Sequence, residues 1–85
     1  MDLQQQFEQA EADVNTLSSR PSNDILLQLY SLHKQSKVGD VNIDPPGNPF
    51  DIVGKAKYQA WSQQKGKSKE DCMKEYIALV QQLKS

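Results

Sequence analysis

Three side chains with aromatic and cationic chemistry recur at helical spacing in the first half of the chain. Tyr30, His33 and Lys34 stand at positions i, i+3 and i+4, so on a helix they share one face. Two rings beside an ammonium suit a ligand with a flat heterocycle and a phosphate, because rings stack and lysine supplies a mobile cation. The pattern indicates a binding site for a small anionic ligand. The alternative is that Tyr30 is a core tyrosine and His33 a half-exposed packing residue.

Further candidate binding residues lie in the last third of the chain. Lys55 and Lys57 stand near the start of a predicted helix, where the helix dipole disfavours cations, and this placement indicates that they face an anion. Tyr76 offers an aromatic face with a polar tip. For Tyr76, too, a buried core position with a satisfied hydroxyl is the common alternative.

Catalytic chemistry has little support in this sequence. Cys72 and His33 are the only nucleophile–base candidates, and a lone cysteine beside Met73 on a helix is usually a packing residue. Gly54 and Gly66 are isolated and form no glycine-rich phosphate loop. One cysteine and one histidine are too few for a structural zinc site, which takes about four such ligands. We therefore expect a protein that is not an enzyme and holds no metal or cofactor.

Charge is distributed unevenly along the 85 residues, although the net charge is only −1. Residues 1–30 carry five acids and one arginine, whereas residues 31–69 carry seven lysines and three acids. A basic middle on a near-neutral protein suits a small anion better than a nucleic acid, which favours a broader basic face. A solvated lysine-rich surface is the alternative.

The bulk composition is that of a small soluble domain. Hydrophobic residues make up 36% of the chain, and the mean hydropathy is −0.75. No apolar run approaches the roughly 20 residues that cross a bilayer, and the N-terminus lacks the features of a secretory signal. We expect a cytoplasmic monomer with no stable membrane insertion.

Four helices and one long connection are predicted, with no strand-like alternation. The first helix covers about residues 2–17, and the second begins at the N-cap Ser22 and stops at Gly39. The third covers about residues 51–64. The fourth follows the N-cap Ser68, with Asp71 three residues later. The first helix rests on an apolar stripe at steps of three and four, formed by Leu3, Phe7, Ala10, Val14 and Leu17.

The connection between the second and third helices is long for so small a chain. Residues 40–50 hold three of the four prolines and Gly47, which exclude a helix or a central strand. Such a loop crosses from one end of a bundle to the other or serves the ligand. The predicted fold is an all-α helix bundle in a single domain, residues 1–85.

Two motifs resemble the acyl-CoA-binding protein family, also called the diazepam-binding-inhibitor family. The first is YSLHKQSKVGD at residues 30–40, and the second is GKAKYQAW at residues 54–61 followed by KGKSKED at residues 65–71. Residues 3–84 fit the family from end to end. The resemblance implies an antiparallel four-helix bundle with a long loop between its second and third helices. It also implies an intracellular carrier and pool former in lipid metabolism and lipid transport, which binds medium- to long-chain acyl-CoA esters in a surface groove.

The resemblance also assigns roles to residues. Tyr30 and Lys34 match the tyrosine and lysine that contact the nucleotide in the family. Lys57 matches the lysine that pairs with the coenzyme A phosphates, and Tyr76 matches the fourth-helix tyrosine of the same site. His33 occupies the place of a second tyrosine, which keeps a ring but reduces the stacking area.

The chain departs from the family pattern at several positions. Asn15 and Pro45 stand where many members carry a basic residue, and residues 48–50 hold one residue more than common members. Losing two cations weakens phosphate binding, and Arg20 and Lys55 are the candidates to compensate.

The expected acyl groove is lined by apolar helix residues such as Leu26, Leu27 and Ile52, where each buried methylene contributes about 0.8 kcal/mol. The expected partners are acyl-CoA esters, without nucleic acid, and with transient contact to enzymes that use acyl-CoA. Two alternatives remain. One is a helical protein-interaction module with no acyl-CoA affinity, and the other is an enzyme that uses Cys72.

Overall fold

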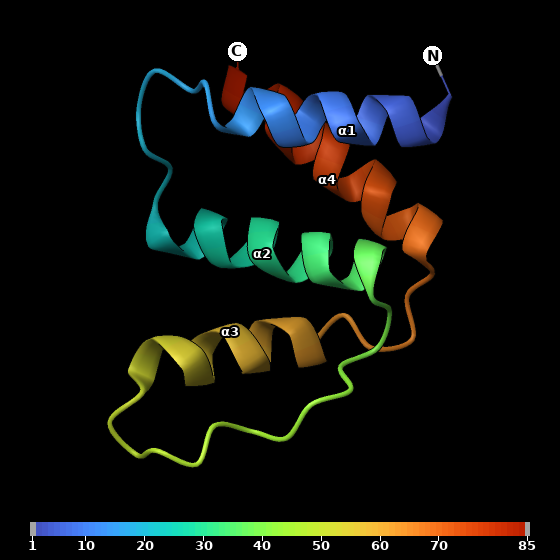
Figure 1. The fold of residues 1–85 in the computed structure, drawn as a ribbon. Helices are drawn as coiled ribbons and strands as arrows, with labels where there is room; N and C mark the ends of the chain where they lie inside the picture. The colour runs from blue at the N-terminus through green and yellow to red at the C-terminus, as the bar shows by residue number, and fades with distance from the viewer. Residues whose placement is uncertain (1, 85) are drawn as a thin grey trace.

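The computed structural model describes residues 2–84, which form four α-helices and, over this range, no strand (Figure 1). The predicted all-α class and the four helices are confirmed. No helix between residues 2 and 84 is both long and apolar enough to cross a bilayer. The helices are α1 (Leu3–Val14), α2 (Asn23–Lys37), α3 (Ile52–Ser62) and α4 (Lys69–Lys84).

Each helix begins with a polar side chain that caps its first turn. The side chain accepts a hydrogen bond from a first-turn amide that has no partner within the helix. The predicted caps Ser22 and Ser68 both act in this way. The amides that donate are those of Gln5 to Asp2, Ile25 to Ser22, Gly54 to Asp51 and Asp71 to Ser68.

Two helices are shorter than predicted. Helix α1 stops at Val14, three residues before Leu17, because the side chains of Asn15 and Thr16 donate hydrogen bonds to carbonyls of its last turn. Such local bonds compete with continuation of the helix. Helix α3 stops at Ser62 rather than Gln64, where backbone bonds of the tighter i to i−3 type close the end.

Helix α2 lies at the centre of the fold, where it packs against both α3 and α4, and α4 packs in turn against α1. Figure 1 shows α1 and α4 running opposite to α2, whereas α3 runs in the same direction as α2. The antiparallel expectation therefore holds for α1 and α4 relative to α2 but not for α3. The parallel pair requires a crossing loop, which was predicted over residues 40–50. In the structure the connection covers residues 38–51 and returns along α3 (Figure 1).

The apolar core is formed by α1, α2 and α4. Cys72 is fully buried in it, in agreement with the packing role predicted for this residue. Helix α3 contributes Trp61, which is 3% exposed and lies against α2. The buried cluster consists of Phe7, Ala10, Leu29, Leu32, Cys72, Tyr76 and Val80.

Several residues of the two sequence motifs hold the ends of helices together. The buried Gln35 donates from Nε2 to Oδ1 of Asp40, at 2.8 Å, and the same oxygen accepts the amide of Gly66 at 2.9 Å. Trp61 donates from Nε1 to the carbonyl of Gly39 at 2.8 Å. Gly39 has φ 97°, a backbone conformation that favours glycine. These contacts join the C-terminal end of α2 to α3 and to the α3–α4 turn.

Candidate ligand-binding site

The ring of Tyr30 is shared by two lysines from neighbouring helices. The Nζ atom of Lys57, on α3, lies 5.2 Å from the ring centroid, and the Nζ atom of Lys34, on α2, lies 6.0 Å from it. Lys34 also lies 5.6 Å from the ring of Trp61. Neither ammonium takes part in an ion pair within the described residues. Two unneutralised cations beside one aromatic ring form a site that attracts an anion.

His33 and Tyr76 lie beside this pair in an aromatic cluster. The ring of His33 is 5.8 Å from the rings of both Phe7 and Tyr76. Its Nε2 atom lies 2.8 Å from Oε2 of Glu11, which Lys37 also approaches at 3.5 Å. Helix α1 therefore fixes the orientation of His33, because Glu11 holds its Nε2 atom and the ring of Phe7 stacks against it at an interplanar angle of 22°.

Tyr76 projects from α4 and is 4% exposed. Burial raises the pKa of the Tyr76 hydroxyl, and the nearby charge of Glu11 raises it further. The hydroxyl therefore stays protonated at neutral pH, and it can donate a hydrogen bond to a phosphate oxygen.

Two cavities adjoin these residues. A cavity of about 310 Å³ is lined by Asn15, Tyr30, His33 and Tyr76 among others. A larger groove of about 640 Å³ lies between α2 and α3, and the two share Leu26 and Tyr30. The groove has a mostly apolar lining, with Arg20 and Lys57 as its cations. Its apolar wall consists of Leu26, Leu27, Ile52, Val53 and Ala56.

The arrangement suits an amphiphile. The lysines and aromatic rings provide contacts for an anionic head with a flat heterocycle, and the adjoining groove provides an apolar surface for a chain.

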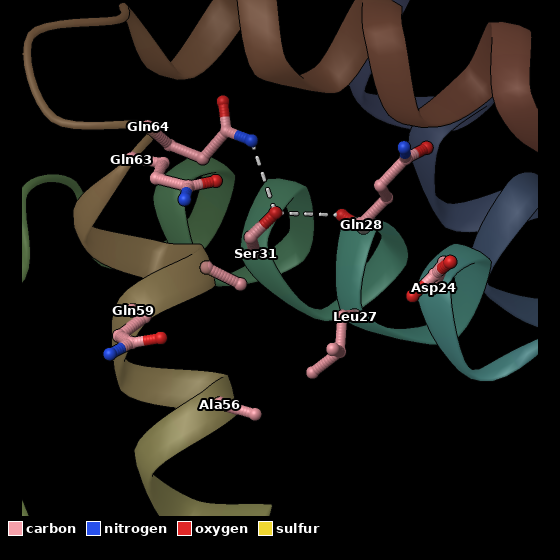
Figure 2. A pocket seen from close by; sticks show the side chains of 9 residues that line it. Asp24, Leu27, Gln28, Ser31, Ala56, Gln59, Gln63 and Gln64 are labelled. Carbon is pink, nitrogen blue, oxygen red and sulfur yellow. Dashed lines mark hydrogen bonds between the residues drawn. The ribbon is translucent and has the colours of Figure 1, made fainter.

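A third cavity between α2 and α3, of about 410 Å³, has a different chemistry (Figure 2). Gln64 donates from Nε2 to Oγ of Ser31 at 3.1 Å, and Ser31 donates to the carbonyl of Gln28 at 2.9 Å. Dashed lines mark both bonds in Figure 2. This cavity shares Leu27 and Ala56 with the apolar groove but contains neither lysine nor arginine. Leu27 and Ala56 therefore separate an apolar space from a polar one. The polar lining comes from Asp24, Gln28, Ser31, Gln59, Gln63 and Gln64.

Comparison with known proteins gives the same answer as the motifs. Residues 4–80 match the family model described as acyl CoA binding protein. The chain belongs to the acyl-CoA-binding protein family. Acyl-CoA-binding protein homolog 1 of Caenorhabditis elegans is 53% identical over 77 residues, which cover 91% of this chain and 88% of that protein. The acyl-CoA-binding protein of Saccharomyces cerevisiae is 49% identical over 95% of this chain and 92% of its own length.

Solved structures of the acyl-CoA-binding protein family share this fold. The crystal structure of Oryza sativa acyl-CoA-binding protein 2 superposes with a TM-score of 0.90 at 41% identity, covering 96% of this chain and 90% of that one. The crystal structure of the Moniliophthora perniciosa protein gives a TM-score of 0.87 at 36% identity, covering 98% of this chain and 80% of that one. The predicted bundle of the acyl-CoA-binding protein type is confirmed.

The structure brings most of the predicted site residues into one region. Tyr30 lies at the centre, with Lys34 and Lys57 on its ring, and the cavity beside it reaches His33 and Tyr76. Of the three further candidates, Arg20 and Leu27 line the apolar groove. Lys55 lines none of the three cavities, and its Nζ atom lies 3.5 Å from the carbonyl of Pro49 in the loop. Arg20 is therefore better placed than Lys55 to compensate for the missing cations.

Sequence reasoning missed several residues of the site. Glu11 and Phe7, both on α1, orient His33, but they precede it by 22 and 26 positions. Phe7 was visible only as part of an apolar stripe, and nothing in the sequence marked Glu11. Val53 and Ala56 line the groove from α3, and the available signal was the position of Ala56, three residues after Val53 and four after Ile52.

Proposed function

We propose that this protein binds medium- to long-chain acyl-CoA esters and acts as an intracellular carrier and pool former for them. The observation that carries the proposal is the pair Lys34 and Lys57 on the ring of Tyr30, directly beside an apolar groove of about 640 Å³. The family to which the chain belongs supports the same ligand class.

Each part of the ligand has a matching part of the site. Lys34 and Lys57 form charge-assisted hydrogen bonds with the coenzyme A phosphates. Tyr30 and the ring face of His33 flank the adenine, and the Tyr76 hydroxyl donates to a phosphate oxygen. The acyl chain lies in the groove, where each buried methylene contributes about 0.8 kcal/mol until the groove is full.

The protein performs no chemistry on its ligand and needs no cofactor in this role. The only thiol, Cys72, is fully buried, and burial raises its pKa, so it is a poor nucleophile. Residues 1–85 form a single acyl-CoA-binding domain that works as a cytoplasmic monomer in lipid transport. Transfer of the ester to enzymes that use acyl-CoA takes place through transient contacts.

Isothermal titration calorimetry with palmitoyl-CoA, palmitate and free coenzyme A tests this function on one preparation. We expect tight one-to-one binding of the ester and much weaker binding of both fragments, because the head and the chain are held by different walls of the site. Absence of ester binding overturns the proposal, and a helical protein-interaction module then becomes the better interpretation.

A further inference from the structure

Residues 48–51 form a tight exposed turn that the proposed function does not use. The Asp51 amide donates to the Asn48 carbonyl at 3.1 Å, which closes a β-turn, and the Phe50 amide donates to Oδ1 of Asn48 at 2.9 Å. Asparagine first and proline second favour such a turn, because asparagine bonds to the backbone two residues later and proline presets its own φ. We call residues 48–51 the Asn-Pro-Phe turn.

Helix α3 holds the Asn-Pro-Phe turn in place. The Ile52 amide donates to the Phe50 carbonyl at 3.0 Å, and Asp51, at φ −85° and ψ 73°, has the backbone angles of an inverse γ-turn. The side chain of Asp51 caps α3, and the Nζ atom of Lys55 lies 3.5 Å from the carbonyl of Pro49. The turn is therefore ordered before any partner binds, so binding costs less conformational entropy than it would for a flexible segment.

The turn presents one aromatic ring and one free amide group. Phe50 is 87% exposed, the highest value among the large apolar side chains of residues 2–84. It lines none of the three cavities, so neither the core nor the ligand groove uses its ring. Asn48 is also exposed, and its Nδ2 atom donates to no group within the described residues, because only Oδ1 is used by the turn.

The position of the turn leaves it open to a partner. Figure 1 shows the end of the loop at the edge of the molecule, beside the start of α3 and away from α1 and α4. The ligand groove includes Ile52 and Val53 but none of the residues of the turn. Binding at the turn therefore requires no residue of the groove.

The pairing of a ring with an amide determines the chemistry of the partner. Any apolar surface could cover the Phe50 ring. The Asn48 amide beside it is costly to bury unless it donates a hydrogen bond, so the partner needs an acceptor next to its apolar surface. Protein pockets combine these two properties, and protein modules often recognise short segments with a fixed backbone conformation.

We propose that the Asn-Pro-Phe turn is a recognition element for a protein module with an apolar pocket for the Phe50 ring. A carbonyl or carboxylate at the rim of that pocket accepts the hydrogen bond from Nδ2 of Asn48. A single turn buries a small area, so the contact is transient. It holds the partner next to the ligand groove. The recognition does not depend on the proposed function.

Titration with an EH domain tests the proposal, because EH domains are small helical modules whose pocket takes the phenylalanine of Asn-Pro-Phe turns. The complete chain is added to an isotope-labelled EH domain, and the chemical shifts of the domain are followed by NMR. A linear Asn-Pro-Phe peptide is the positive control. We expect one-to-one binding of the wild-type chain, with shift changes at the same pocket as for the peptide.

Three variants separate the contributions of the turn. Phe50→Ala removes the buried ring, and binding should become about tenfold weaker or more. Asn48→Asp keeps an oxygen that accepts the Phe50 amide but loses the amide donor, and it should also weaken binding by about tenfold. Ile43→Ala is the matched control and should bind as the wild type does, because Ile43 is an apolar residue of the same loop, 56% exposed, that lies outside the turn.

Each outcome decides the proposal. Failure of the wild-type chain to bind an EH domain that binds the linear peptide overturns it. Binding that is lost in Phe50→Ala but kept in Asn48→Asp also overturns it, because the partner then reads only an apolar ring. So does an equal loss in Ile43→Ala, or self-association in light scattering that Phe50→Ala abolishes, because the ring then contacts a second copy of the chain. A chain that binds the EH domain but not palmitoyl-CoA supports this inference and overturns the proposed function alone.

Discussion

Replacing Lys57 with methionine removes one of the two cations on Tyr30 and keeps the length of the side chain. In the free protein the Lys57 ammonium lies 5.2 Å from the ring centroid, and its neighbour Lys34 lies 6.0 Å from it. Removal costs a cation–π contact of about 0.5–1 kcal/mol at an exposed site, and it also relieves repulsion between two like charges. We therefore expect the free energy of unfolding to change by no more than about 0.5 kcal/mol.

The effect of Lys57→Met on ligand affinity is expected to be much larger. A hydrogen bond to a charged group contributes about 1.5–3 kcal/mol, and Lys57 is an exposed residue, so the lower end of this range applies. About 1.4 kcal/mol corresponds to a tenfold change in Kd, so palmitoyl-CoA should bind about tenfold more weakly. Part of the difference should disappear at high salt, because added ions screen exposed charges.

The assay is calorimetric titration of palmitoyl-CoA at low and physiological ionic strength. Lys74→Met is the matched control, since Lys74 is an exposed lysine on α4 that lines none of the three cavities. Two results refute the reasoning. One is wild-type affinity in Lys57→Met, and the other is an equal loss in Lys74→Met, which reports only the overall charge of the protein.

Three further predictions follow from the structure. Ala56→Leu places a larger side chain in the apolar groove. Affinity should therefore fall for palmitoyl-CoA and stay unchanged for octanoyl-CoA in the same titration, because each methylene excluded from the groove costs about 0.8 kcal/mol. An unchanged dependence of affinity on chain length contradicts this prediction. Phe7→Ala empties a fully buried position, and thermal melts followed by circular dichroism should show a loss of about 3–5 kcal/mol, a large share of the stability of so small a domain. The Gly66 amide and, to a smaller extent, Gln35 lower the pKa of Asp40. The Asp40 carboxylate therefore contributes fully to stability above the pKa that it has in the unfolded chain, and this contribution is lost as the pH falls below about 4. Asp40→Asn should lower the urea midpoint at pH 7 and match the wild type near pH 2, and a constant difference at both pH values contradicts the assignment.

The local parts of the fold could be predicted from the sequence because their causes are local. Ser22 and Ser68 cap the helices that follow them, and each acts within three residues of itself. The end of α1 was placed too late because Asn15 and Thr16 bond to backbone carbonyls, a competition that an apolar stripe does not reveal. The direction of α3 relative to α2 depends on the path of the loop, which periodicity does not encode.

Within the site, too, contacts inside one helix could be predicted from the sequence, whereas contacts between separate helices could not. Tyr30, His33 and Lys34 could be placed on one face because they share a helix. Lys57 and Tyr30 are 27 positions apart in the sequence and meet in the structure. Their place in one site was predicted from the family resemblance and not from residue spacing. No pattern indicated that Glu11 would hold His33, because that contact depends on how two separate helices pack.

Helix α3 packs against α2 alone among the other helices, although it supplies one wall of the groove. Local stability follows the number of neighbours, so α3 and its loop form the least protected cooperative unit of the domain. Its C-terminal end is tied down by Trp61, so subglobal opening begins at the end that carries Ile52. A ligand held between Tyr30 and Lys57 joins the two helices at that end. In amide hydrogen exchange, the free energy of binding should therefore appear mainly as slower exchange within α3.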